Sequence, residues 1–464
     1  MQKQNFITKS DSYKFGHGPM YSPNTTTVYS YFEARKGAKF EATVFFSLQY
    51  ILKEYFVGKV ITQEMIDNAE KIISTHLGEG AFNKEGWQYI LNKYNGKLPL
   101  SIKAVPEGMV IPVGNVMFTV ENTDPKCFWL TNFVESILSH VWYGSSTATL
   151  AHETKIMLRR FLEVTDEDPE ATINFAFHDF GYRSSSSDES AAIGGAGQLL
   201  SFMGTDTVTA IEFLMHYYNA EVCAYSVNAS EHSVMSGEGK EGEFNVVKRL
   251  INKYPKGILA LVIDSYDYRN FIKEAGTTFK ETILAREGKL VFRPDSGEPI
   301  ATSLEVIELI GKYFGYSYNS KGYKVLNPKV GMLWGDGITL DGIYNILQNF
   351  LENGWAASNI VFGQGGALHH TGVSRDMQRC AFKSSHQVAN GISKNIFKDP
   401  IDGSKKSKKG RLALVYRNDK YETLQEVEGV IEDDLLVEVF RDGELLVEYS
   451  LDEVKTNLAN SNIV

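Results

Sequence analysis

The sequence is poor in cysteine and lacks long apolar runs. Its 464 residues include 3 cysteines, Cys127, Cys223 and Cys380, and none of them has the C-x-x-C spacing of a zinc or redox site. Isolated cysteines argue against a disulfide framework or a zinc cluster and favour a reducing compartment. No apolar run reaches the length needed to span a bilayer, and the first residues lack the apolar core of a signal peptide. We therefore expect a cytoplasmic protein with no membrane partner.

An excess of positive charge is also missing, because the formal net charge is −10. This balance argues against nucleic acid or an anionic membrane as a general partner. A phosphorylated ligand would have to be held by local cations. The one dense basic stretch runs from Lys405 to Arg411, and as a bare pattern it is more typical of a solvated loop than of a binding site.

The length predicts one large domain and a second one. Residues 1–170 have mixed patterns: a helix over 61–77 with Thr62 as its cap and Gly78 at its end, short strands over 100–120, and helical periodicity over 129–162. Residues 412–464 are strand-like and acidic from 432 to 448, and we expect them to return to this mixed α+β domain. Residues 171–411 are expected to form the other domain.

Within 171–411 one pattern occurs six times, in which a short apolar run ends in polar or glycine-rich residues and an amphipathic stretch follows. The apolar runs cover 173–177, 222–227, 258–263, 290–292, 330–334 and 360–362, with helical stretches such as 303–314 and 340–351 between them. Repeated strand, polar loop and helix predict an α/β fold, a (β/α) barrel whose active site lies at the C-terminal ends of its strands. A doubly wound open sheet would give the same local pattern and is the alternative.

The loops after these runs carry residues suited to phosphate and ribose. Gly365 and Gly366 would let backbone N–H groups approach a phosphate, and the turn of Gly335, Asp336 and Gly337 is similar, although either motif alone is more often a plain turn. Arg293 and Asp295, two residues apart at a strand end, offer a cation to a phosphate and a carboxylate to ribose hydroxyls. A structural salt bridge is an equal alternative for that pair.

Two further positions offer a titratable group and flat rings. His232, after Glu231 at a strand end, is a candidate nucleophile or base, although a lone histidine is more often structural. Asp267, at the end of the next apolar run, could hold one nitrogen of its ring. Phe180 and Tyr13 are candidates for stacking on a flat ring, with core packing as the alternative. The shared position of these motifs at successive strand ends favours a functional site.

The chain resembles the nicotinamide phosphoribosyltransferase family over nearly its whole length. The resemblance rests on ten ordered segments: Asp11–Lys14, Tyr29–Arg35, His178–Arg183, Gly204–Thr207, Ala229–Ser233, Asp264–Asp267, Arg293–Gly297, Gly335–Gly337, Phe397–Pro400 and Ser407–Arg411. It implies the irregular (β/α) barrel of the type II phosphoribosyltransferases, with a second mixed α+β domain built from the N- and C-terminal parts. It also implies a transferase of NAD salvage that makes nicotinamide mononucleotide and pyrophosphate from nicotinamide and phosphoribosyl pyrophosphate.

The resemblance further implies a homodimer with active sites shared between subunits. Phe180 of one subunit and Tyr13 of the other would enclose the nicotinamide ring, and Arg183 would face it. Asp206 would accept a hydrogen bond from the carboxamide and repel the carboxylate of nicotinate.

The phosphate and ribose groups would lie on one set of residues of each subunit, and the partner subunit would add a second, cationic set. The first set is Arg293, Asp295, Asp336, Gly365, Gly366 and Arg375, and the second is Arg35, Lys383, Lys398 and Lys405. His232 resembles the histidine that the family phosphorylates with ATP, with Asp267 orienting it and Glu231 beside it. Mg²⁺ would neutralise the leaving pyrophosphate.

Three positions differ from the family pattern. Asn228 stands where a proline is usual, Ile263 where a small polar residue is common, and Phe175 where a tyrosine is usual, and we expect all three to line the tunnel that leaves the ring site. The main alternative activity is nicotinate phosphoribosyltransferase, which Asp206 disfavours. A non-catalytic binding or signalling homologue is disfavoured because His232, Arg293 and Asp295 are all present.

Overall fold

The computed structural model describes residues 5–401 and 406–461. Contacts within the chain divide it into two compact units. Unit 1 comprises Met1–Thr149, Leu214–Ala220 and Ser374–Val464, and unit 2 comprises Leu150–Phe213 and Glu221–Val373. None of the described helices is both long and apolar enough to cross a membrane.

The units end at other residues than the sequence patterns suggested. Residues 150–170, expected in the mixed domain, belong to unit 2, where Lys155 Nζ donates to Asn174 Oδ1 and to the carbonyl of Ser201. Residues 374–411, expected in the barrel, belong to unit 1 because β15 (Ala381–Ala389) pairs with β1 (Thr25–Glu33).

Unit 2 contains a sheet of 7 parallel strands in the order β7-β6-β14-β13-β10-β9-β8. The strands are β6 (Phe177–Asp179), β7 (Gly204–Thr205), β8 (Asn228–Ala229), β9 (Leu259–Val262), β10 (Leu290–Arg293), β13 (Val330–Trp334) and β14 (Ile360–Gln364). Their order follows the chain cyclically, since β14 returns to pair with β6. A doubly wound sheet would reverse its strand order at a switch point, so this alternative is excluded.

The two edges of this sheet approach each other at Tyr225. The N–H of Tyr225 donates to the carbonyl of Met203 at 2.8 Å, and its carbonyl accepts from the N–H of Thr205 at 3.1 Å. Three residues later the same segment becomes β8 and pairs with β9. The sheet therefore curls into an irregular barrel, which confirms the expected fold class.

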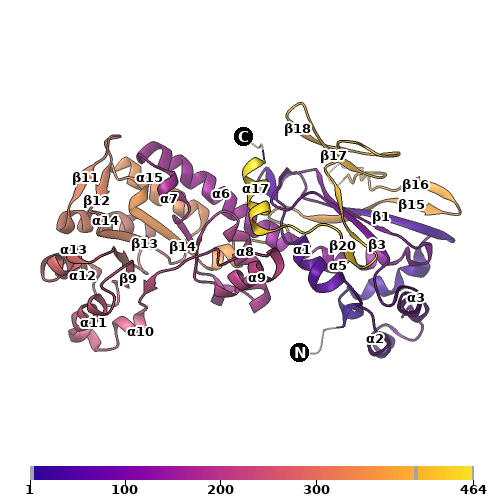
Figure 1. Ribbon diagram of the computed structural model, residues 1–464, viewed down its shortest axis with the longest axis horizontal. Helices are drawn as coiled ribbons and strands as arrows, with labels where there is room; N and C mark the ends of the chain where they lie inside the picture. Colours follow the sequence, from indigo (N-terminus) through magenta and orange to yellow (C-terminus); the bar gives the residue numbers. More distant parts are fainter. Residues whose placement is uncertain (1–4, 402–405, 462–464) are drawn as a thin grey trace. The chain divides into compact units, whose positions relative to one another are not determined.

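Helices surround the outside of these strands (Figure 1). They include α8 (Asp188–Leu199), α11 (Gly239–Lys253), α12 (Tyr268–Thr277), α14 (Pro299–Phe314) and α15 (Leu340–Glu352). In α15 the side chains of Ile343, Ile346, Leu347 and Phe350 are buried, and Thr339 caps the helix by accepting from the N–H of Gly342. Apolar residues at this spacing form one face of a helix, which explains why the sequence pattern located α14 and α15 well.

The barrel strands fit the expected runs unevenly. The four runs from 258 to 362 correspond to β9, β10, β13 and β14. Over 173–177 the chain first completes α7 (Glu170–Ile173), and the strand begins only at Phe177. The expected strand over 222–227 is absent, and this segment has only an isolated bridge at Tyr225. The sequence pattern did not predict β7, which has only 2 residues.

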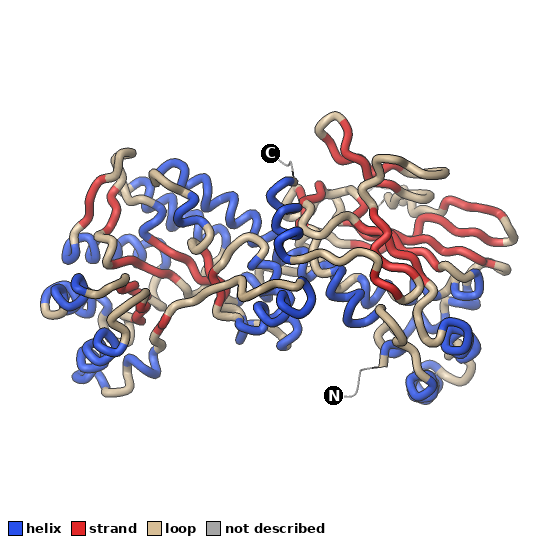
Figure 2. Tube along the Cα trace, viewed as in Figure 1, coloured by secondary structure: helices blue, strands red, loops and turns tan. Residues whose placement is uncertain are grey.

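Unit 1 is built on a sheet of 7 strands in the order β16-β15-β1-β5-β3-β19-β20, and all its pairings are antiparallel (Figure 2). The remaining strands of this sheet are β3 (Leu100–Ala104), β5 (Val116–Asn122), β16 (Ile392–Asn395), β19 (Val437–Arg441) and β20 (Glu444–Leu445). The expected helix is α2 (Gln63–Leu77), with Thr62 accepting from the N–H of Met65 and Gly78 following at φ 102°. The expected C-terminal strands are β19 and β20, and α17 (Leu451–Asn460) then ends the chain as an element that we had not expected.

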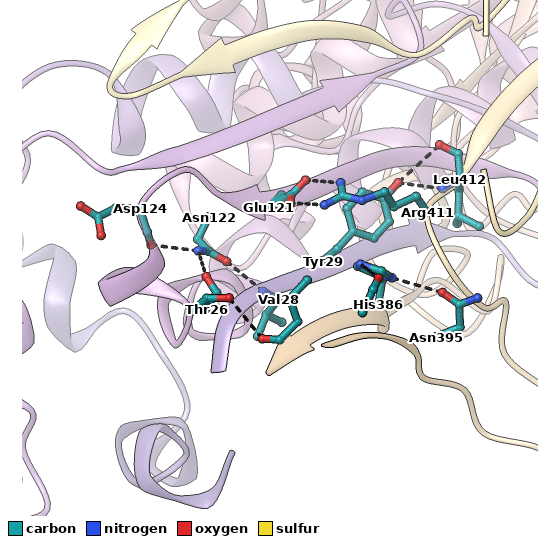
Figure 3. Close-up of polar contacts among 12 residues, drawn as sticks. Thr26, Val28, Tyr29, Glu121, Asn122, Asp124, His386, Asn395, Arg411 and Leu412 are labelled. Carbon is teal, nitrogen blue, oxygen red and sulfur yellow. Dashed lines mark hydrogen bonds and ion pairs between the residues drawn. The ribbon is translucent and has the colours of Figure 1, made fainter. Parts of the chain in front are cut away.

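The segment after the basic run is fixed to this sheet by polar side chains (Figure 3). Arg411 donates through both terminal nitrogens to the two carboxylate oxygens of Glu121 on β5. The hydroxyl of Tyr29 on β1 accepts from the N–H of Leu412 at 3.1 Å. A two-point arginine–carboxylate pair fixes direction as well as distance, so it sets where this chain segment crosses the sheet.

Candidate active site

The inside of the barrel contains a cavity of about 360 Å³. Phe180, Asp206 and Arg293 line it at the C-terminal ends of the strands. Its middle is mainly apolar and is lined by His178, Ala229, Ala260, Val291, Leu333 and Val361. Phe175, Ile258 and Lys289 lie just before strands, at the other end. The cavity therefore offers a polar mouth, an apolar wall and a single lysine at the far end.

Phe180 directly follows β6, and two glycines, one on β14 and one just after β13, make room for its ring. A Cβ atom on Gly363 would lie 2.0 Å from Phe180 Cε2, and one on Gly335 would lie 3.1 Å from it. The N–H of Phe180 donates to the carbonyl of Gln364 at 3.0 Å, and the guanidinium of Arg293 lies 5.8 Å from the ring centroid. The ring is thus held at the cavity mouth beside a cation.

A buried histidine holds the residues on both sides of Phe180. His369 Nε2 lies 2.7 Å from Asp179 Oδ1, and His369 Nδ1 lies 3.0 Å from Ser185 Oγ. A Cβ atom on Gly181 would lie 2.0 Å from the same imidazole, so the chain passes directly over it. Because a carboxylate only accepts, Nε2 carries the proton towards Asp179, and Nδ1 forms the second hydrogen bond, with Ser185. Sequence reasoning missed His369, which carries no local motif.

Asp206 follows β7 and lies on the cavity wall. Its carboxylate accepts a hydrogen bond from Ser226 Oγ, a residue that sequence reasoning also missed. Burial lowers the pKa of His178 while the nearby Asp206 carboxylate opposes that shift. A carboxylate beside an aromatic ring at the mouth of an apolar cavity suits a flat ligand with an N–H donor.

Several buried polar atoms near the strand ends have no hydrogen-bond partner among the described residues. They are Arg293 Nε, Asp264 Oδ1, Ser265 Oγ and Gln364 Oε1. Arg293 Nη2 donates to Asp295 Oδ1 at 3.4 Å, so the two residues form the pair that their spacing suggested. Since buried polar groups are normally satisfied, this group of open donors and acceptors marks a place for a polar ligand.

His232 is placed differently from the sequence hypothesis. Its Nε2 lies 3.4 Å from Asp264 Oδ1 and its Nδ1 lies 3.9 Å from Asp295 Oδ2. The expected pairing with Asp267 is corrected, because the Asp267 carboxylate caps α12 by accepting from the N–H groups of Arg269 and Asn270. Asp264 lies two residues after the end of β9, whereas Asp267 immediately precedes α12, and this difference was visible in the sequence.

His232 is half-exposed, with 49% of its side chain accessible, while the side chain of Asp264 is 4% exposed. A buried carboxylate beside an accessible imidazole can orient the ring and leave its other face open to a reagent. Glu231 begins α10 (His232–Met235), and its carboxylate accepts from Ser233 Oγ.

The two glycine turns lie where the sequence placed them. Gly335, Asp336 and Gly337 follow β13, Gly337 has φ +56°, and the carbonyl of Asp336 accepts from Trp334 Nε1 at 2.9 Å. Gly365 follows β14, and a Cβ atom there would lie 3.2 Å from the carbonyl oxygen of Phe180.

Of the three positions expected to line a tunnel, one lines this cavity. Phe175 lines the cavity, but Asn228 is exposed and Ile263 is buried, and neither is a lining residue. Arg183 is exposed on the loop after Phe180 and does not line the cavity either.

The other expected site residues belong to unit 1. Tyr13 is 59% exposed, and the ring of His17 lies 5.2 Å from it. Arg375, expected beside Arg293, also belongs to unit 1. Burial lowers the pKa of Lys383, and the neighbouring charges of Arg35, Arg375 and Lys14 act in the same direction while Glu135 opposes them. Arg35, Arg375 and Lys383 therefore form one cationic group of unit 1.

The basic run is less available than its composition suggests. Lys406, Lys408, Lys409 and Arg411 pair with Asp399, Glu33, Glu426 and Glu121 respectively. Lys398 is exposed, and its N–H donates to Ser407 Oγ at 2.8 Å. Lys405 lies outside the described residues. The Lys398 ammonium forms no ion pair with any of the described residues.

Solved structures share the architecture at low sequence identity. A nicotinate-nucleotide pyrophosphorylase from Pyrococcus furiosus has a TM-score of 0.62 at 13% identity, with 100% of this chain and 98% of that chain covered. A human nicotinic acid phosphoribosyltransferase has a TM-score of 0.59 at 13% identity, with 97% and 93% covered. The fold is that of the type II phosphoribosyltransferases.

Sequence comparison is more specific. Residues 175–444 match the nicotinate phosphoribosyltransferase family, and residues 5–102 match the N-terminal domain of nicotinamide phosphoribosyltransferase. Proteins named nicotinamide phosphoribosyltransferase are 40% identical in Xanthomonas campestris pv. campestris, over 98% of each chain, and 34% identical in Acinetobacter baylyi, over 98% of this chain and 97% of that one. The chain belongs to the nicotinamide phosphoribosyltransferase family and is a pentosyltransferase.

Proposed function

We propose that the protein transfers the phosphoribosyl group of phosphoribosyl pyrophosphate to nicotinamide, giving nicotinamide mononucleotide and pyrophosphate in NAD salvage. The observation that carries this proposal is the position of the Asp206 carboxylate and the Phe180 ring together at the mouth of the apolar cavity. Both groups come from barrel strand ends, where this fold places substrates.

The ring site favours an amide over an acid. Nicotinamide stacks on Phe180, and its carboxamide NH₂ donates to Asp206, whose other hydrogen bond comes from Ser226. Nicotinate would bring a second negative charge to the same place and would offer Asp206 no N–H donor. Nicotinate phosphoribosyltransferase, the activity named for the human structural neighbour, is therefore the second candidate.

The phosphoribosyl group lies across the open polar atoms at the strand ends. Arg293 provides a cation whose Nε has no partner among the described residues, Asp295 faces the ribose hydroxyls, and the turns at Gly335–Gly337 and Gly365–Gly366 cover the phosphate. The bond from C1 of the ribose to pyrophosphate breaks as an oxocarbenium-like centre forms, and the pyridine nitrogen attacks that centre. Positioning of the two reactants and charge stabilisation supply the catalysis.

The carboxylates at these strand ends fit a magnesium ion. Mg²⁺ uses one or two protein carboxylates and completes its coordination with water and substrate phosphates. The Asp264 side chain is 4% exposed and its Oδ1 faces His232 Nε2, and Asp295 lies beside it, since the N–H of Asp295 donates to Asp264 Oδ2 at 2.9 Å. When bound, the ion would neutralise charge on pyrophosphate.

ATP is proposed as a second phosphoryl source that modifies His232. The accessible imidazole attacks the γ-phosphorus, the bond to ADP breaks, and Asp264 orients the ring through Nε2. Hydrolysis of this phosphohistidine would be coupled to the release of pyrophosphate. The test is ATP hydrolysis by His232→Ala, which we expect to be lost while slow synthesis of the mononucleotide persists; unchanged ATP hydrolysis would refute the assignment.

A homodimer with shared sites is proposed because several residues of the family's site belong to unit 1. The partner's Tyr13 would cover the second face of the nicotinamide ring, and the partner's Arg35, Lys383, Lys398 and Lys405 would bind phosphates. The exposed ring of Tyr13 and the cationic group of unit 1 support this arrangement. The small number of isolated cysteines favours a cytoplasmic location.

Subunit mixing tests the shared site. Tyr13→Ala and Phe180→Ala should each be nearly inactive as pure preparations. In a mixed dimer one site keeps both rings, so a refolded equal mixture should recover about a quarter of the wild-type activity if subunits pair at random. No recovery in a preparation shown to contain mixed dimers would contradict sharing.

A further inference from the structure

Lys289 stands at the end of the cavity opposite the proposed reaction centre. It immediately precedes β10, and Arg293 ends the same strand. Four residues at the usual rise of a strand separate their backbones by about 13 Å. The wall between them is mostly apolar, so the cavity joins two cationic side chains through a hydrophobic passage.

The Lys289 ammonium has no hydrogen bond or ion pair with any residue in the two described ranges. Its side chain crosses the space over Gly331, where a Cβ atom would lie 3.2 Å from Lys289 Cδ and 3.8 Å from Nζ. Burial lowers the pKa of this amine. Other lysines near this end are already paired: Lys256 Nζ lies 2.8 Å from Glu287, and Lys329 Nζ donates to the carbonyl of Arg286. Lys289 is thus an uncompensated cation that lines a cavity.

We propose that this end of the cavity is a subsite for a carboxylate, the terminal group of an amphipathic small molecule whose apolar body lies along the cavity wall. A single ammonium supplies one charge and three donors, which matches a monoanion. A phosphate dianion is more strongly hydrated and would require further donors that the neighbouring Ile258 and Phe175 do not have. The apolar wall in turn favours a ligand with a hydrocarbon or aromatic body.

The inference is independent of the proposed reaction, because it concerns binding to the unreacted protein. The probes are 5-phenylpentanoate, its primary amide and inorganic phosphate, each titrated into the full-length protein by calorimetry without phosphoribosyl pyrophosphate. A charge-assisted hydrogen bond should make the carboxylate bind about tenfold more tightly than the amide.

Two neutral variants and one matched control test the residue. Lys289→Met and Lys289→Gln should bring the affinity for the carboxylate down to that of the amide, and Lys289→Arg should keep the preference. Lys256→Met, which removes a lysine near the same strand ends that does not line the cavity, should behave as wild type. Thermal unfolding shows whether each variant is folded. If only one of the two neutral variants folds, that variant alone is enough to test the role of Lys289.

Three results would overturn the proposal. One is equal affinity of the wild type for the carboxylate and the amide. Another is an unchanged carboxylate preference in the folded neutral variants. The third is phosphate binding that exceeds carboxylate binding and is lost in the same variants. Failure here with normal turnover would refute the subsite alone, whereas a lack of turnover with normal carboxylate binding would refute the proposed reaction alone.

Discussion

Gly363→Ala should damage the ring site while leaving the fold intact. An alanine Cβ at this position would lie 2.0 Å from Phe180 Cε2 and 2.2 Å from Cδ2. The aromatic ring must therefore retreat by about 1.4 Å to reach an ordinary contact of 3.4 Å. A displacement of about 1 Å in a positioning group can cost about 100-fold in rate. We expect kcat/KM for nicotinamide to fall by about that factor.

The assay is the initial rate of mononucleotide formation at varied nicotinamide, with phosphoribosyl pyrophosphate saturating. The matched control is Gly342→Ala in α15, where the nearest atom to the new Cβ would be 3.4 Å away and alanine favours the helix. The control should keep wild-type kinetics. If Gly363→Ala keeps kcat/KM within twofold of wild type while its melting temperature is unchanged, Phe180 does not form the ring platform.

Four further variants test separate parts of the account. Asp206→Asn should lose most of the preference for nicotinamide over nicotinate, and an unchanged ratio of the two kcat/KM values would contradict the role of Asp206. Asp264→Asn should reduce ATP hydrolysis at least tenfold, whereas Asp267→Ala should leave it unchanged and cost about 1 kcal/mol of unfolding free energy, since Asp267 caps α12. Burial raises the pKa of Glu107 from 4.5 to about 7, so the folded protein binds a proton there that the unfolded chain releases. The unfolding free energy of the wild type, relative to that of Glu107→Gln, should therefore fall by about 3 kcal/mol as pH rises from 4.5 to 7. Chemical unfolding at several pH values measures both free energies. If the two depend on pH in the same way, the buried proton on Glu107 is refuted.

The barrel could be predicted because long buried strands and amphipathic helices carry strong periodic signals. β9, β10, β13 and β14 each have three or more consecutive buried residues, and α15 buries one face. β7 and β8 have 2 residues each, and such short strands are defined by their neighbours in space and not by their own composition. α17 was missed although Ser450 and Glu453 form a capping box, which is a local signal that the strand-like composition before it obscured.

The candidate site was predictable where its residues follow strands directly. Phe180 and Arg293 line the cavity as the strand-end pattern indicated, and Asp206, which only the family resemblance had indicated, lines it as well. The partner of His232 was assigned wrongly because two aspartates lie three residues apart, and only the end of β9 and the start of α12 distinguish Asp264 from Asp267.

Residues whose role depends on a partner far along the sequence could not be predicted from a local pattern. His369 is far along the chain from Asp179, and the two meet only because β14 pairs with β6. Lys289 lies outside every motif, and its significance depends on the cavity that the other strands enclose. Contacts of this kind are a property of the fold and not of a local pattern.

The most direct test of the central claim is a competition between the two pyridine substrates. The purified protein is incubated with phosphoribosyl pyrophosphate, Mg²⁺, ATP and equal concentrations of nicotinamide and nicotinate, and the products are identified by mass. We predict nicotinamide mononucleotide as the dominant product, because we propose that Asp206 accepts from an amide and repels an acid. Nicotinate mononucleotide as the main product would contradict the account of the ring site, and the absence of both products would contradict the proposed reaction.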